Sequence, residues 1–169
     1  MASKGIKQQV GALPYRQIEE GKLELLLITS RDTGRWLIPK GWPMAGVKDC
    51  DAAAQEAWEE AGVVGPVRRK PIGSYRYDKL LPKKAIPCRV TVFPLLVEIF
   101  DYAWPEFGER KRAWFSPEEA ASLVLEKGLA KILSGFSPKE GKADGYKWSP
   151  VSARGGKTDT ASQASLRRE

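Results

Sequence analysis

Residues 41–63 read GWPMAGVKDCDAAAQEAWEEAGV, and this stretch says most about the fold of the chain. Within it, Glu56, Glu59 and Glu60 are spaced at i, i+3 and i+4. Successive residues of an α-helix turn by about 100°, so the three carboxylates share one helix face within an arc of roughly 100°. Like charges this close together destabilise a helix. A bound divalent cation would offset that cost, because Mg²⁺ and Ca²⁺ take carboxylate oxygens as ligands.

The stretch predicts a helix with two different faces. Asp49 or Asp51 is suited to cap its start, because a short carboxylate accepts hydrogen bonds from free backbone N–H groups. Gly62 is suited to end it, because glycine enters the left-handed conformation without steric cost. The face away from the glutamates carries mostly small residues, which let the helix approach a neighbour closely: Cys50, Ala54, Ala57, Trp58 and Ala61.

A short buried strand is predicted just upstream, at Trp36 to Ile38. Residues 39–44 follow as a loop that contains two prolines and one glycine. Proline stiffens such a loop because its ring fixes one backbone angle. The local order is therefore strand, glycine-containing loop, acidic helix.

This order resembles the signature of the Nudix hydrolases. Their box reads Gly, five residues, Glu, seven residues, then Arg-Glu-hydrophobic-any-Glu-Glu-any-Gly-hydrophobic. Gly41 stands at the first glycine, and the second half matches in register at Glu56, Ala57, Glu59, Glu60, Gly62 and Val63. Two positions depart, because the family's first Glu falls on Val47 and its Arg falls on Gln55. Paired glutamates alone are common on solvated helix faces, so the resemblance depends on the full register.

A second segment resembles one subgroup, the diphosphoinositol polyphosphate phosphohydrolases. Residues 104–115 form a basic segment that ends in Trp114-Phe115 and leads into the last predicted helices. The entry to the box, WLIPKG at residues 36–41, is also similar to that subgroup. The resemblance covers roughly residues 8–137 and implies the α/β/α sandwich of the family, with a mixed β-sheet.

The rest of the pattern agrees with an α/β (α+β) fold. Strands are expected over residues 8–16, 23–30, 67–70, 73–80, 89–100 and 112–115. Ser116 to Glu119 has the pattern of a capping box with Pro117 at the first helical position. Helices are expected from there to about residue 124 and from about residue 125 to 133. Few helices among many strands favour a mixed sheet packed by helices on both faces.

One domain is expected for a chain of 169 residues, and we place it at residues 1–137. From residue 138 onward Lys, Gly, Ser, Asp and Thr dominate. Residues 138–169 are therefore expected to form a flexible basic tail, because they have too little apolar surface to order themselves. The formal charge of the chain is +7, which points to an anionic substrate or surface.

Cellular context is predicted from three further features. Cys50 and Cys88 give no disulfide framework, and the first residues contain no apolar signal segment. No run approaches the ~20 apolar residues of a membrane span. We therefore expect a cytoplasmic protein with no membrane partner. The chain has no histidine, which excludes histidine-activated nucleophiles, histidine zinc sites and phosphohistidine chemistry.

The resemblance implies metal-dependent hydrolysis of a pyrophosphate bond, with Mg²⁺ as the cation and Mn²⁺ as an alternative. A metal neutralises charge on phosphate oxygens and lowers the pKa of bound water. We expect Glu56 and Glu60, the i, i+4 pair, to be metal ligands, and Glu59 to be a third ligand or the general base. Glu59 and Glu60 are thus the catalytic candidates, and either can take the proton. Backbone groups near Gly41 are expected to complete the metal site, since glycine lets the main chain approach a ligand closely.

Basic residues around the box are expected to bind an anionic phosphorylated small molecule. Arginine suits this task because its guanidinium forms two parallel hydrogen bonds to a phosphate. The candidates lie before the box, within predicted strands and before the last strand: Arg31, Arg35, Lys40, Arg76, Arg89, Arg110 and Arg112. Trp42, Tyr75 and Tyr77 are candidates for stacking on a base, if the substrate contains one. The favoured role for each of them is packing.

Three functions are consistent with these residues. The favoured one is a diphosphatase for diphosphoinositol polyphosphates or dinucleoside polyphosphates. The second is a pyrophosphatase for ADP-ribose or a nucleotide sugar, against which the many basic residues argue mildly. The third is a non-catalytic module that binds a nucleotide or nucleic acid, which Val47 and Gln55 keep open. The intact glutamate set argues against this third function, and nucleic acid is not the expected partner.

Overall fold

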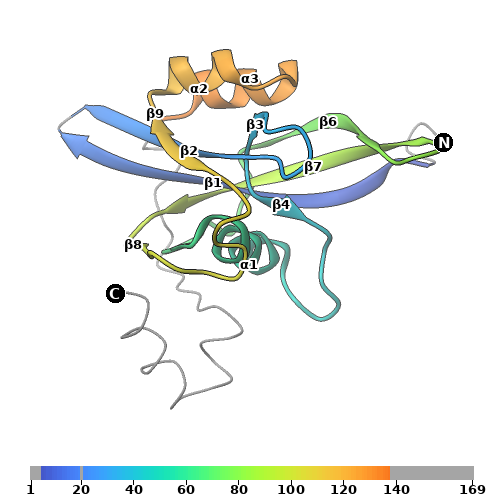
Figure 1. The fold of residues 1–169 in the computed structure, drawn as a ribbon. Helices are drawn as coiled ribbons and strands as arrows, with labels where there is room; N and C mark the ends of the chain where they lie inside the picture. The colour runs from blue at the N-terminus through green and yellow to red at the C-terminus, as the bar shows by residue number, and fades with distance from the viewer. Residues whose placement is uncertain (1–4, 20, 138–169) are drawn as a thin grey trace.

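Three layers make up the computed structural model, which describes residues 5–19 and 21–137 (Figure 1). Helix α1 (Asp49–Ala61) covers one face of the central sheet. Helices α2 (Pro117–Leu123) and α3 (Lys127–Gly135) cover the other face. The α/β/α sandwich expected from the sequence is thereby confirmed.

The central sheet is mixed, as expected. Strands β1 and β7 run parallel to each other, whereas the other neighbours are antiparallel. Its five-strand path is β3 (Trp36–Leu37), β2 (Lys22–Thr29), β1 (Lys7–Glu19), β7 (Ala85–Leu96) and β6 (Gly73–Leu80). Two short strands attach beside it: β4 (Lys40–Gly41) pairs with β1, and β9 (Arg112–Phe115) pairs with β2. The pairing of Val10 with Gly41 places β4 beside helix α1.

Strand alternation supplies two separate hydrophobic cores. Successive side chains of a strand point to opposite faces of the sheet. Leu26 and Ile28 of β2 therefore pack toward α1, whereas Leu25 and Leu27 pack toward α2 and α3. The small-residue face of α1 is fully buried on the sheet, as its composition predicted.

Helix α1 ends as expected but begins differently. Gly62 takes the left-handed conformation, with φ of 70°, and its N–H bonds back to the helix. The residue at the N-terminal cap is Lys48, with no side-chain hydrogen bond, so the prediction that Asp49 or Asp51 caps the helix was wrong. Both aspartates lie in the first turn instead, where negative charge favours the helix through its dipole.

Two strand predictions were wrong in the same region. Residues 67–70 form no strand, because Val67 makes only an isolated bridge to Leu95. The expected strand over 89–100 ends at Leu96. The N–H of Val97 still bonds to β1, whereas that of Glu98 bonds to Val64, so the backbone changes partners at Glu98. A separate two-stranded sheet results, made of β5 (Val63–Val64) and β8 (Ile99–Phe100).

The closing helices agree with the sequence signals. Ser116 and Glu119 form the expected capping box, with proline in the first turn of α2. Strands β6 and β9 have the expected bounds. Helix α3 starts two residues later than predicted. The flexible basic tail predicted for residues 138–169 lies outside the described residues.

Candidate active site

Glu56 and Glu60 lie side by side on α1 and are held by the two residues of β4. A Cβ atom at position 41 would overlap the carboxyl group of Glu56, so the main chain at Gly41 lies directly against that carboxyl. The backbone N–H of Lys40 donates to Oε1 of Glu60 at 3.2 Å. The glycine at position 41 thus has a steric reason, because any side chain there would displace Glu56.

Both carboxyl groups are shielded from water. Glu60 is 8% exposed. Burial, followed by the nearby charges of Glu60 and Glu59, raises the pKa of Glu56 to about 8. Burial also raises the pKa of Glu60 to about 7, although the positive charge of Arg110 opposes that rise. Two buried carboxylates that repel each other favour either a proton or a cation between them.

Glu59 has a different environment on the same helix. Its Oε2 accepts a hydrogen bond of 2.7 Å from Nε2 of Gln55, a residue that is 6% exposed. Gln55 is the position where the family box has arginine, so a neutral donor holds Glu59 in this chain. Glu59 thus shares the helix face with Glu56 and Glu60 but has its own hydrogen-bond partner.

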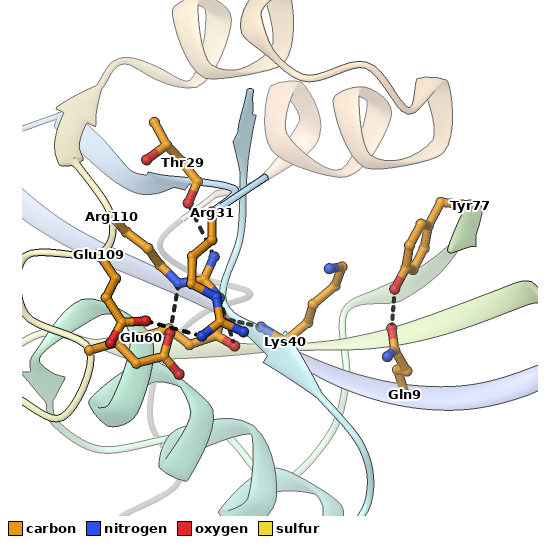
Figure 2. Close-up of polar contacts among 9 residues, drawn as sticks. Gln9, Thr29, Arg31, Lys40, Glu60, Tyr77, Glu109 and Arg110 are labelled. Atoms are coloured by element: carbon orange, nitrogen blue, oxygen red, sulfur yellow. Dashed lines mark hydrogen bonds and ion pairs between the residues drawn. The ribbon is translucent and has the colours of Figure 1, made fainter. Parts of the chain in front are cut away.

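Arg110 joins the acidic helix to two distant segments (Figure 2). Its Nη2 lies 3.6 Å from Oε2 of Glu60, and its Nε lies 2.9 Å from Oε1 of Glu106. Its Nη1 donates to the carbonyl oxygen of Thr29 at 3.1 Å. The side chain is only 9% exposed, so these contacts fix its position. Arg110 therefore lies against the acidic group and partly neutralises Glu60.

Arg31 reaches the same place from the segment that follows β2. Figure 2 shows its guanidinium beside Arg110 and Glu60. Its Nη1 forms an ion pair of 3.0 Å with Glu109, in which both side chains are about half exposed. Arg31 is thus brought to the site in an accessible position, whereas Arg110 is enclosed.

Arg112 lies at the C-terminal end of α1 rather than against the acidic group. Its guanidinium donates to the carbonyl oxygens of Ala61 and Asp101 and stacks on Phe100 and Trp104. Burial lowers its pKa to about 10. The hydrogen bond to Ala61 satisfies a carbonyl group that the end of a helix leaves free, and together these contacts give Arg112 a structural task.

Arg76 and Arg89 face each other across β6 and β7. Strand alternation puts them on the sheet face opposite to Tyr75 and Tyr77. Tyr75 and Tyr77 pack on the α2–α3 side. The structure therefore does not bring these two arginines to the cavity described next, although it places them beside each other.

A cavity of about 440 Å³ adjoins the acidic helix. Lys40 connects the two, because its backbone bonds to Glu60 while its side chain lines the cavity. Its ammonium lies 4.7 Å from the ring centre of Tyr77, and burial lowers its pKa. The lining comes from four segments of the chain: Ser30, Asp32, Thr33, Arg35, Leu37, Lys40, Tyr77, Asp78, Lys79, Leu80, Leu125 and Glu126.

The aromatic candidates for stacking have different environments. Tyr77 lines the cavity and donates a 2.7 Å hydrogen bond to Gln9, as Figure 2 shows. Tyr75 is 4% exposed and belongs to the core, so it has the packing role expected for it rather than the stacking role. Trp42 is 45% exposed and is not among the residues that line the cavity.

The sequence did not single out two acidic residues of this region. Glu106 comes from the segment before β9, and its backbone N–H bonds to the carbonyl oxygen of Glu59. Glu126 lines the cavity at the start of α3. Neither has a local motif around it, because each reaches the site through contacts with residues far away in the chain. Only the three-dimensional structure could identify them.

The pair Glu56 and Glu60 suits a divalent cation that takes only part of its ligands from the protein, rather than one that is surrounded by protein ligands. In residues 5–19 and 21–137, no three His, Cys, Asp or Glu side chains are arranged to hold a metal ion. Mg²⁺ usually binds one or two carboxylates and completes its shell with water and substrate phosphates. Two carboxyl groups of raised pKa, that of Glu60 buried and that of Glu56 partly buried, supply that donor set beside the main chain at Gly41.

Comparison with known proteins agrees with this arrangement. The NUDIX domain family matches residues 7–136. The chain is 36% identical to Nudix hydrolase 18, mitochondrial, of Arabidopsis thaliana, covering 78% of this chain and 76% of that protein. It is 30% identical to human diphosphoinositol polyphosphate phosphohydrolase 3-beta, covering 82% and 85%. The crystal structure of C. elegans Ap4A hydrolase has a similar fold, with TM-score 0.55, 20% identity and coverage of 76% and 94%.

The chain belongs to the Nudix family, and it is a hydrolase of that family. The expected resemblance is thereby confirmed. In the part of the chain that the structure describes, no helix is long and apolar enough to cross a membrane.

Proposed function

We propose that the chain hydrolyses a pyrophosphate bond in a polyphosphorylated or nucleoside diphosphate-linked substrate, with Mg²⁺ or Mn²⁺ as cofactor. The observation that carries this proposal is the pair Glu56 and Glu60, which lies against the backbone of β4, where Lys40 also lines a cavity. A cation between the carboxylates would neutralise phosphate oxygens and make bound water more acidic.

The residues of the chain have distinct tasks in this reaction. Glu56 and Glu60 would hold the cation, and Lys40 and Arg31 would face the phosphates from two sides. The oxygen of water bonds to phosphorus as the bridging P–O bond breaks. Glu59 or Glu60 takes the water proton, and Gln55 orients Glu59 for that task through its hydrogen bond. Arg110 holds Glu60 and the segment around Glu106 in place relative to each other through its two ion pairs.

Two substrate classes are proposed. The human relative is named for diphosphoinositol polyphosphates, and the C. elegans structure is of an Ap4A hydrolase. Both classes offer a chain of phosphates linked to a ring or nucleoside, which suits a site of carboxylates next to basic residues. We propose the cytoplasm as the compartment because the two cysteines are free and buried, although the Arabidopsis relative is named as mitochondrial.

The test is a hydrolysis assay on three substrates: a diphosphoinositol polyphosphate, a diadenosine polyphosphate and ADP-ribose. Wild type, Glu60→Gln and Glu56→Gln are compared in Mg²⁺ and in Mn²⁺. We expect turnover of at least one substrate by wild type and a loss of at least about 100-fold in each variant, since even outer partners of a metal site are worth 10- to 100-fold.

Glu118→Gln is the matched control, because Glu118 is exposed on α2 and makes the same change of charge. It should retain wild-type turnover. Equal turnover by Glu60→Gln and wild type would contradict the proposed site, and no turnover of any of the three substrates would contradict the proposed reaction.

A further inference from the structure

The cavity beside Lys40 is electrically balanced, unlike the chain as a whole. The chain carries a formal charge of +7. The lining of the cavity contains three basic residues, Arg35, Lys40 and Lys79. It also contains three acidic residues, Asp32, Asp78 and Glu126. A ring that bears many phosphates would bring its charge next to these carboxylates, and like charges brought together oppose binding.

Glu126 neutralises Arg35, the arginine that lines the cavity. Its Oε2 lies 2.9 Å from Nη2 of Arg35, and its side chain is only 9% exposed. Glu126 occupies the cap position before α3 but makes no capping hydrogen bond with its side chain. The carboxylate is therefore committed to Arg35 rather than to the helix. A phosphate would have to compete with it for the guanidinium.

The same pair keeps two polar atoms without partners. Nη1 of Arg35 and Oε1 of Glu126 are buried and have no hydrogen-bond partner among the described residues. One is a donor and the other an acceptor. Each atom exposes less than 1 Å², so both are enclosed within the ion pair and out of reach of a ligand. A ligand in the cavity therefore meets an ion pair whose charges already balance. An uncharged group leaves that pair intact, whereas a phosphate would have to separate it to reach the guanidinium.

The remaining lining suits a flat apolar group. Leu37 and Tyr77 form part of the wall, and the Tyr77 ring is fixed by its hydrogen bond to Gln9. Leu80 and Leu125, which are 80% and 74% exposed, also line the cavity. Aromatic rings and aliphatic side chains bind the faces of bases, because every base has an apolar face.

We propose that this cavity binds the uncharged nucleoside part of the substrate, and that Glu126 is the residue that selects it over a polyphosphorylated ring. The inference rests on the proposed function, because it assigns the cavity to the substrate of that reaction. Lys40 then lies between the nucleoside and Glu60, so the scissile phosphates meet the acidic helix. Of the two proposed substrate classes, the dinucleoside polyphosphate is the one that fits.

The test compares kcat/KM for diadenosine tetraphosphate and for a diphosphoinositol polyphosphate in wild type and Glu126→Gln. Wild type is expected to prefer the dinucleotide. Glu126→Gln should lower the ratio of the two kcat/KM values by at least about tenfold, because it releases Arg35 for phosphate. Glu118→Gln, with the same change of net charge at a distant exposed position, should leave the ratio unchanged.

A second variant and a binding measurement protect the test from a folding defect. Asp78→Asn changes an exposed cavity residue on β6 and should shift the ratio in the same direction by less. Calorimetric titration with ADP and with inositol hexakisphosphate should show the same shift of preference toward the inositol phosphate in Glu126→Gln without turnover. A wild-type preference for the inositol substrate, or an unchanged ratio in both variants, would overturn the inference while leaving the proposed hydrolysis standing. If wild type turned over neither substrate, the proposed function itself would be contradicted.

Discussion

The acidic group on α1 and the cavity next to it are built in opposite ways. Glu56, Glu59 and Glu60 come from little more than one turn of a single helix. The cavity draws on four segments, from the region before β3 to the link between α2 and α3. The first could be recognised from spacing alone, whereas the second has no signature in the sequence.

The acidic and the basic residues also differ in how well the sequence predicted their positions. Clustered carboxylates were expected to share a helix face, and the structure places two of them together at a common backbone contact. Clustered basic residues were expected to form one anion site, but they separate into different environments. Arg110 bonds to Glu60 and Glu106, Arg112 bonds to the end of α1, and Arg35 bonds to Glu126. An arginine in a sequence tells nothing of the carboxylate it will meet.

The largest expected effect concerns Arg112, which was predicted to bind substrate. Arg112→Ala should destabilise the protein by about 2–4 kcal/mol, because it leaves a cavity between two aromatic rings and removes the side-chain donors to the Ala61 and Asp101 carbonyl groups. Urea unfolding measures this, with the exposed Arg76→Ala as control, for which a change within about 0.5 kcal/mol is expected. Unchanged stability together with weaker substrate binding would show that Arg112 binds substrate, as the sequence predicted, rather than supporting the end of α1.

Gly41→Ala should lower kcat/KM by about 10- to 100-fold. The added Cβ would overlap the carboxyl group of Glu56 and displace it from the position next to Glu60. The Mg²⁺ concentration for half-maximal activity should rise in parallel. Gly135→Ala is the control, since a Cβ at that position meets nothing within 4 Å. Wild-type activity in Gly41→Ala would show that the close approach of the main chain is dispensable.

Stability without metal should fall as pH rises. The pKa of Glu56 is raised to about 8 and that of Glu60 to about 7, from 4.5 for an ordinary glutamate. Between about pH 4.5 and 8 the folded chain therefore binds more protons than the unfolded chain, so deprotonation favours unfolding. We expect a loss on the order of 1–2 kcal/mol from pH 5.5 to pH 8 in EDTA, by urea unfolding.

Added Mg²⁺ should reverse this loss at pH 8 more than at pH 5.5, because a cation binds the folded, deprotonated pair. Glu56→Gln should flatten the pH dependence in EDTA. The same slope in the variant and in wild type would assign the effect to other groups.

The smallest effect is expected for the exposed pair Arg31 and Glu109. A double-mutant cycle with Arg31→Gln and Glu109→Gln should give a coupling energy in stability of about 0.2–1 kcal/mol, as is usual for exposed ion pairs. The cycle for Arg110 and Glu106, whose side chains are mostly buried, should give a larger value. Equal coupling energies in the two cycles would contradict the conclusion that Arg31 is accessible and Arg110 enclosed.

Local signals predicted the elements that carry the acidic group. The position of Gly62, the capping box at Ser116 and the bounds of β6 and β9 follow from residues close together in the chain. The errors arose where a segment chooses between partners. Residues 97–100 are apolar enough for a strand, but the sheet they join depends on the hydrogen bond from the N–H of Glu98 to Val64. Residues 67–70 contain one apolar residue, Val67, which forms an isolated bridge to Leu95 of β7.

The sequence by itself determined the family, the three-layer fold and the helix that carries Glu56, Glu59 and Glu60, because helical spacing and turn chemistry act over a few residues. Tertiary structure alone decided that Arg112 supports the end of α1, that Arg110 lies against Glu60, and that the cavity is balanced in charge. The physical reason is that an ion pair forms between whichever side chains the fold brings within reach, and the partner can lie anywhere in the chain.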